Sequence, residues 1–285
     1  MDDVVESHES AEVKDFHERD LSGARFVRSR MPGAYFRELR MPGSLFHDVD
    51  LAGSTFRSVG LAGVRVVGSG LRDVSLDGEV EGSLLVNGVD VAPYVEAELD
   101  RRHPEKALLR PDDARGFRHA WDVVEQLWEP TLERARAMAA RDPEVLHEHV
   151  DSEWSFTQTL RHLDFAIDCW VTRVLLGVPM PWHALDLPWD EAEPVEGMPW
   201  DKGARPDLDT VLANRADHHA VVRRVLDDLT DERLAATTTP VEAPGHPSPD
   251  AYPVKEVLRT VLDEEWWHHR FAVRDLDALE ARPGR

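Results

Sequence analysis

Residues 153–176, EWSFTQTLRHLDFAIDCWVTRVLL, contain the clearest structural pattern in the C-terminal part of the chain. Their apolar residues recur at alternating steps of four and three, which is the spacing of core positions in a helical bundle. These residues are Phe156, Leu160, Leu163, Ile167, Trp170 and Val174. Gly177 and Pro179 follow the pattern, as expected just after the last turn of a helix. We therefore expect a helix over about 155–176 with one buried face.

Three further segments carry the same kind of apolar face. The first covers about 112–139, where Pro130 should bend or divide the helix. The other two cover about 208–229 and 253–280. Together, the four segments predict an all-α four-helix bundle over 112–282.

The stretch 177–206 has no helical period and is rich in proline and tryptophan. It therefore predicts a long loop between the second and third helices, and long loops of this kind are often functional. Trp182, Trp189 and Trp200 either form the roof of a pocket or hold the loop in place. The sequence does not decide between these two roles.

Residues 20–83 contain an internal repeat of five residues. Every fifth position from Leu21 to Leu76 is apolar, and Met-Pro-Gly occurs at both 31–33 and 41–43. A period of five fits neither a helix nor a strand. It suits a solenoid that points one apolar side chain inward at each corner. The pattern resembles the pentapeptide-repeat family, and this resemblance implies a right-handed β-helix of about three coils.

The expected protein is therefore multidomain. An N-terminal segment over 1–19 precedes the β-solenoid over 20–83, and a connector over 84–111 leads to the bundle over 112–282.

The formal net charge of -22, without a basic run, argues against nucleic acid and anionic membranes as partners. Residues 21–80 carry more arginines than acidic residues, which argues against mimicry of DNA by the repeat. No apolar run is long enough to span a bilayer, and the first residues are acidic rather than apolar. Because Cys169 is the only cysteine, no internal disulfide can form. We expect a cytoplasmic protein.

Glu265 and His269 interrupt the apolar face of the last segment. Because they are four residues apart, they share a helical face and could bind one metal ion together. His162, at the edge of the face of the second segment, could supply a third ligand. Two nitrogens and one carboxylate suit Zn, Ni or Fe(II). The alternative for Glu265 is a buried ion pair, for example with Arg215, because an unpaired buried carboxylate is costly.

Two motifs resemble those of the DinB-like superfamily. Residues 153–163, EWSFTQTLRHL, resemble its second-helix motif, and residues 264–270, EEWWHHR, resemble its last-helix motif. Members often bind a divalent metal through three histidines, and the corresponding positions here are His162, Glu265 and His269. The departure at Glu265 leaves two interpretations. Either Glu265 is a ligand, or the site has lost tight binding or uses His268 instead.

The resemblance implies a metal-dependent transferase or hydrolase that acts on a small-molecule substrate. The superfamily includes enzymes that use a low-molecular-weight thiol such as mycothiol, so the expected cofactors are a divalent metal (Zn, Ni or Fe) and such a thiol. Arg215 and His219 lie on the core stripe of the third segment. They would lie near the metal or the substrate, unless that helix is rotated so that both face solvent.

The alternative function is a non-catalytic ligand- or protein-binding module with the repeat as an adaptor. The sequence identifies no catalytic residue. It also leaves open whether the protein forms a homodimer.

Overall fold

The computed structural model describes residues 16, 18–36, 39–56, 59–78, 80, 82–151, 153–190, 192, 195 and 197–282. The chain divides into two compact units between Arg65 and Val66. The predicted N-terminal segment over 1–19 lies mostly outside the described residues, and the predicted boundary at 83/84 remains a prediction.

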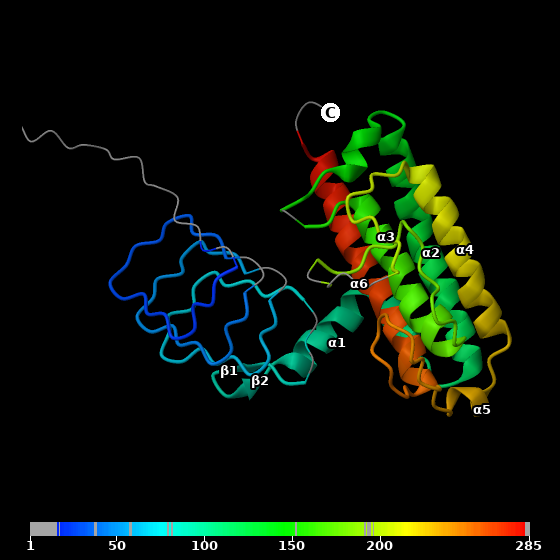
Figure 1. Ribbon diagram of the computed structural model, residues 1–285, viewed down its shortest axis with the longest axis horizontal. Helices are drawn as coiled ribbons and strands as arrows, with labels where there is room; N and C mark the ends of the chain where they lie inside the picture. The colour runs from blue at the N-terminus through cyan, green and yellow to red at the C-terminus, as the bar shows by residue number, and fades with distance from the viewer. Residues whose placement is uncertain are drawn as a thin grey trace, which may run out of the picture. The chain divides into compact units, whose positions relative to one another are not determined.

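Four long helical segments of the second unit lie side by side as a bundle (Figure 1). They are α2 (Ala114–Ala139), α3 (Phe156–Ile167) continued by η3 (Asp168–Leu175), α4 (Leu208–Asp227) and α6 (Val254–Glu280). Helix α6 packs against α2 and α3, and α4 packs against the same two helices. Helices α4 and α6 therefore face each other across the core. The predicted helical bundle is confirmed.

The apolar face of 153–176 is buried as its spacing predicts, up to the point where the helix changes type. Phe156, Leu160, Leu163 and Ile167 are each at most 1% exposed. From Asp168 onward the chain forms the π-helix η3, which has more residues per turn than an α-helix. The buried face therefore shifts along the chain. Within η3 it includes Val171, which is fully buried, whereas Trp170 is only partly buried.

Local sequence signals set where the helices begin and end. Ser155 begins α3 with a capping box in which its side chain accepts from the amide of Gln158, and the Gln158 side chain accepts from the amide of Ser155. Asp207 caps α4 by accepting from the amide of Thr210. Pro130 does not divide α2, which continues to Ala139.

Shorter elements precede and connect the bundle helices. They are β1 (Leu85–Val86), β2 (Val89–Asp90), α1 (Ala92–Arg102), η1 (Pro104–Leu109), η2 (Pro143–His147) and α5 (Asp231–Leu234). Strands β1 and β2 pair antiparallel around Asn87-Gly88, where both residues have positive φ. The 3₁₀-helix η1 packs against α2 and α6. Among the described helices, none has both the length and the apolar character to cross a membrane.

The repeat forms a regular series of turns. The amides of Ala24, Ala34, Ser44, Ser54 and Val64 each donate to the carbonyl three residues earlier. In each turn the third residue is a glycine with φ between +68° and +74°, a conformation that side chains other than glycine rarely adopt. This is the backbone requirement of a type II turn, and it explains the glycine at every tenth position.

The predicted β-helix is not confirmed by this part of the structure. The described residues before Leu85 contain no β-strand. Phe26, Phe36, Phe46 and Phe56 keep between 57% and 61% of their surface exposed, so they do not line a dry interior. The local turns follow the sequence, but the stacked ladder and packed core that define a β-helix are absent from the described residues.

Candidate metal centre

Three potential ligands meet where α3 packs against α6. One ligand atom from each of His162, Glu264 and His268 lies within 4.8 Å of the others. Oε2 of Glu264 is 3.8 Å from Nε2 of His162 and 3.2 Å from Nδ1 of His268. The three side chains are 12%, 31% and 15% exposed, so a small molecule can approach them from solvent.

Backbone carbonyls orient both imidazole rings. Nδ1 of His162 lies 2.9 Å from the carbonyl oxygen of Leu187, and Nδ1 of His268 lies 2.9 Å from that of Glu264. These contacts favour the tautomer with hydrogen on Nδ1, which leaves the lone pair on Nε2. Burial lowers the pKa of His162 to about 3, and burial also lowers the pKa of His268. Both rings are therefore neutral at pH 7, as metal ligation requires.

Aromatic side chains surround the cluster. The ring of Trp154 lies 4.5 Å from that of His162 and 6.2 Å from that of His268, between ring centroids. On the other side of His162, Phe165 packs against Trp182 and Trp200 at 5.8 and 5.4 Å. These apolar surroundings exclude water from part of the site.

The tryptophans of the long loop pack around Phe165, which in turn packs against His162. Trp182 is buried with Phe165, while Trp189 keeps 38% of its surface exposed. These contacts correspond to the anchoring role that the sequence allowed, and the roof of a pocket stays a prediction.

A buried arginine holds the loop against α3. Arg161 donates to the carbonyl oxygens of Leu185 and Ala204 at 2.7 and 2.8 Å, and it also donates to that of Asp201. The amide of Leu187 donates to the carbonyl of Arg161. These contacts fix the backbone next to the Leu187 carbonyl, which accepts from His162. The loop thus supports the orientation of His162.

Glu265 lies in the core and pairs with Arg215. Their side chains are 1% and 4% exposed, and Nη2 of Arg215 is 2.6 Å from Oε2 of Glu265. Nη1 of the same arginine is 3.6 Å from Oδ1 of Asp164, and its guanidinium lies 5.0 Å from the ring centroid of Trp128. Glu265 therefore forms the buried ion pair that the sequence offered as the alternative to metal ligation.

His269 and His219 also make contacts away from the His162 cluster. Nε2 of His269 lies 2.9 Å from Oγ1 of Thr131 on α2. Nε2 of His219 lies 3.8 Å from Oε1 of Glu265, and its ring packs 4.9 Å from that of Trp121. Burial lowers the pKa of His269 to about 4 and lowers that of His219 well below its usual range.

The expected metal set of His162, Glu265 and His269 stays a prediction, and the described structure groups His162 differently. Among the described residues it brings His162 together with Glu264 and His268. The reason is the rotation of α6. Successive residues of an α-helix point about 100° apart. Position 265 faces Arg215 on α4, position 269 faces α2, and positions 264 and 268 face α3. His268, the alternative ligand in the sequence, is the one that reaches His162.

Sequence reasoning missed Glu264 because it is adjacent to the more conspicuous Glu265. The available signal was spacing, since Glu264 and His268 are also four residues apart. It also missed a second buried group formed by Asp168, Asp186 and His218. Asp186 belongs to the long loop, whose contacts no periodicity predicts.

This second group perturbs the pKa values of its members. Burial, followed by the charge of Asp168, raises the pKa of Asp186 to about 8. Burial lowers the pKa of His218, but its contact with Asp168 and the charge of Asp164 outweigh this effect and raise it to about 9. Excess negative charge therefore favours bound protons on both groups near neutral pH.

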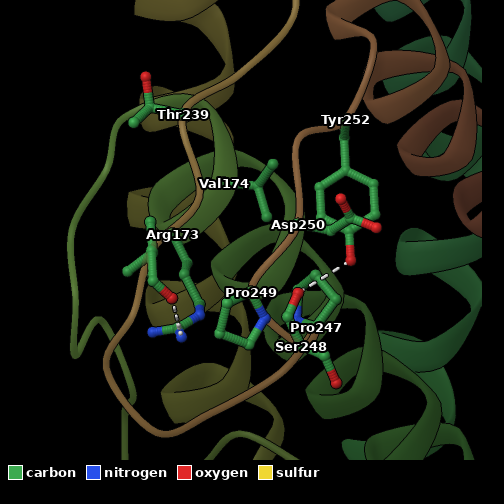
Figure 2. A pocket seen from close by; sticks show the side chains of 9 residues that line it. Arg173, Val174, Thr239, Pro247, Ser248, Pro249, Asp250 and Tyr252 are labelled. Atoms are coloured by element: carbon green, nitrogen blue, oxygen red, sulfur yellow. Dashed lines mark hydrogen bonds between the residues drawn. The ribbon is translucent and has the colours of Figure 1, made fainter.

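Two hollows lie elsewhere on the second unit. The first, between η3 and the segment 239–252, has a volume of about 10 Å³, roughly the space of one water molecule. Figure 2 shows Arg173 and Tyr252 in its wall, where the Tyr252 hydroxyl donates to the Ser248 carbonyl at 2.9 Å. The second is an open surface hollow of about 540 Å³ over the first turns of α2. Neither includes His162, Glu264 or His268.

The second unit is a helical bundle, and its histidine–carboxylate cluster lies between α3 and α6. This fold and this cluster place the protein among helical bundles with a candidate metal site. The family model of the DinB superfamily matches residues 117–272, more than half of the chain. The chain therefore belongs to the DinB superfamily. No curated protein and no solved structure matches the chain. The comparisons do not support the pentapeptide-repeat resemblance.

We predict that Glu265→Gln destabilises the protein by about 3 kcal/mol, because it removes the close charged partner of buried Arg215 and leaves only the longer contact with Asp164 at 3.6 Å. Urea unfolding of the purified protein measures this change. Glu264→Gln is the matched control, since Glu264 is 31% exposed, and it should change the free energy of unfolding much less. Equal stabilities of the two variants would contradict the central role of the ion pair.

We also predict that stability falls as pH rises from about 6.5 to 9 in the presence of a chelator. The pKa values of Asp186 and His218 are raised to about 8 and about 9 in the folded state, so the folded protein binds more protons than the unfolded chain in this interval. Their contribution is present at lower pH and is lost as pH rises through these values.

Urea midpoints measured across this pH range check the prediction. Asp186→Asn should reduce the slope, whereas Asp228→Asn, at an exposed position after α4, should retain it. A constant midpoint in the wild-type protein between pH 6.5 and 9 would contradict the assignment.

Proposed function

We propose that the bundle is a divalent-metal-dependent enzyme of the transferase or hydrolase type, with His162, Glu264 and His268 as the metal ligands. The observation that carries this proposal is the orientation of the two histidines. Each has Nδ1 against a backbone carbonyl, and the Glu264 carboxylate lies near Nε2 of His162 and near Nδ1 of His268. Two imidazoles and one carboxylate with open positions suit Zn, Ni or Fe(II).

The residues fit a metal in a second respect. Glu264 is the only negatively charged member of the cluster, and the two histidines are neutral at pH 7. The cluster can therefore accept a dication without first losing a proton. When bound, a divalent metal would lower the pKa of a coordinated water or thiol and supply a nucleophile near neutral pH.

The chain's own residues would orient the ligands and limit access of water. The carbonyl of Leu187 holds His162, and Arg161 holds the loop that carries this carbonyl. Trp154 covers both imidazole rings, and its Nε1 donates to Asp190 at 2.9 Å. The exposed part of Trp189 offers an apolar surface for a small-molecule substrate.

A low-molecular-weight thiol such as mycothiol is the co-substrate that we propose, on the strength of membership in the DinB superfamily. Cys169 does not take this role, because burial raises its pKa well above the usual range of a thiol. The thiolate would therefore come from the co-substrate. We place the reaction in the cytoplasm, and a homodimer remains a prediction.

The metal assignment predicts that His268→Ala removes one metal ion per chain, whereas His269→Ala does not. Only His268 lies with His162 and Glu264, while His269 contacts Thr131. The measurement is the metal-to-protein ratio by mass spectrometry after the purified protein is loaded with Zn²⁺ and excess metal is removed.

Glu264→Gln and Glu265→Gln form a second matched pair, and only the former should weaken binding. The opposite result, with metal lost in the 265 and 269 variants and kept in the 264 and 268 variants, would refute the ligand set proposed here. A wild-type protein that binds no metal would refute the enzyme proposal.

We propose further that residues 20–83 fold as a pentapeptide-repeat β-helix that serves as an adaptor. The twelvefold apolar period and the turns at every tenth residue support it. If the bundle proves to bind no metal, this adaptor with a ligand-binding bundle is the second candidate function. Tyr35 and Leu45, which are 81% and 85% exposed and lie outside the repeat positions, favour a surface that contacts another protein.

The β-helix predicts different outcomes at two adjacent positions. Phe46 is a repeat position that would point inward, so Phe46→Glu should destabilise the repeat by at least about 2 kcal/mol. Leu45, which is 85% exposed, is the control, and Leu45→Glu should be tolerated. Thermal unfolding and limited proteolysis of the full chain compare them. Equal tolerance of both substitutions would rule out a packed β-helix.

A further inference from the structure

A second cluster of potential ligands lies inside the bundle and plays no part in the proposed function. Asp168 begins η3, Asp186 belongs to the loop between η3 and α4, and His218 lies on α4. One ligand atom from each lies within 4.8 Å of the others. The three residues are 4%, 0% and 8% exposed, so the cluster is buried.

The histidine of this cluster is oriented as metal-binding histidines usually are. Nδ1 of His218 lies 2.8 Å from the carbonyl oxygen of Asn214, and Nε2 lies 3.3 Å from Oδ2 of Asp168. The carbonyl contact favours hydrogen on Nδ1. In the neutral ring it directs the lone pair of Nε2 toward the carboxylate group, where a shared cation would lie.

Asp186 has an oxygen without a partner. Its Oδ2 accepts from the amide of His183 at 2.7 Å, but Oδ1 is buried and makes no hydrogen bond with the described residues. A fully buried carboxylate oxygen without a donor is costly. A bound cation would satisfy this oxygen.

The surrounding charges leave an excess of carboxylates. Asp164 lies on the same face of the helical segment as Asp168, one turn earlier, and its Oδ1 is also without a hydrogen bond. Arg215, which contacts Asp164 at 3.6 Å, makes its close pair with Glu265. Protonated His218 pairs with Asp168 at 3.3 Å, and a cation would balance the charge of this group in place of that proton.

The two other buried arginines nearby do not supply this charge. Arg161 donates to the carbonyls of Leu185, Asp201 and Ala204. Arg173 donates to those of Pro179, Val241 and Ala243. Both guanidinium groups are directed at loop backbone rather than at the aspartates.

We propose that Asp168, Asp186 and His218 bind a second divalent cation, distinct from the one at His162, Glu264 and His268. Two carboxylates and one imidazole suit Zn²⁺ or Mn²⁺. The cation would join the long loop to η3 and α4. Because Asp186 precedes Leu187, whose carbonyl accepts from His162, it would also stabilise the backbone that orients the first site.

The test is metal analysis of the full chain after treatment with a chelator, loading with Zn²⁺ and removal of the excess. The wild-type protein should bind about two ions per chain. Asp186→Asn and His268→Ala should each bind about one, and the double variant should bind almost none. Asp228→Asn is the control for loss of a carboxylate and should bind as many ions as the wild-type protein.

Thermal unfolding adds a second measurement. Asp186→Asn keeps the shape of the side chain and removes a buried negative charge, so the chelated variant should be at least as stable as the chelated wild type. Zn²⁺ should raise the unfolding temperature of this variant less than that of the wild type. His218→Gln should reproduce the loss of one ion independently.

The outcomes separate the two sites. If the wild-type protein binds one ion that His268→Ala removes and Asp186→Asn retains, the second site is refuted and the first stands. A proton on Asp186 would then take the place of the cation. If the only ion is lost in Asp186→Asn and kept in His268→Ala, the second site stands and the first fails. A wild-type protein that binds no ion refutes both.

Discussion

The pair between Arg215 and Glu265 is the interaction on which the interior of the bundle depends. Helices α4 and α6 face each other across the core, and this ion pair joins them at 2.6 Å with both side chains almost fully buried. The arginine also lies near Asp164 of α3 and over Trp128 of α2, so one guanidinium contacts all three neighbouring helices. A buried charge is tolerated only with such partners. The ion pair therefore restricts how the helices can be rotated relative to one another.

This constraint determines where the candidate metal ligands lie. With Glu265 directed at α4, the helical period turns Glu264 and His268 toward α3 and His162. His269 is turned toward Thr131 of α2. The pairs Glu265/His269 and Glu264/His268 have the same spacing of four residues but different roles. One pair contributes to the core, and the other lies with His162 in a partly exposed cluster.

The long loop is the second constraint on the site. The buried arginines Arg161 and Arg173 donate to its carbonyls at Leu185 and Pro179 and so hold it against the helical segment that carries His162. Through Leu187 the loop orients His162, and through Asp186 it reaches the second cluster. An arginine directed at carbonyl oxygens satisfies polar backbone groups that would otherwise be buried without partners. This explains how a loop rich in proline and without regular structure can be held in one conformation.

The amphipathic pattern was enough to predict the four helical segments, the buried faces of α3 and α6, and the kinds of side chain available for a metal. The spacing of apolar residues predicts which residues share a helical face. The buried residues of α3 agree with this prediction up to Asp168, where η3 begins and the number of residues per turn changes. The pattern does not show which neighbouring helix each face meets; the packing of the folded chain shows this. That choice depends on where Arg215 pairs and on loop contacts such as those of Asp186 and Leu187. For this reason spacing could suggest either Glu265 with His269 or Glu264 with His268, and packing against α3 brought the second pair to His162.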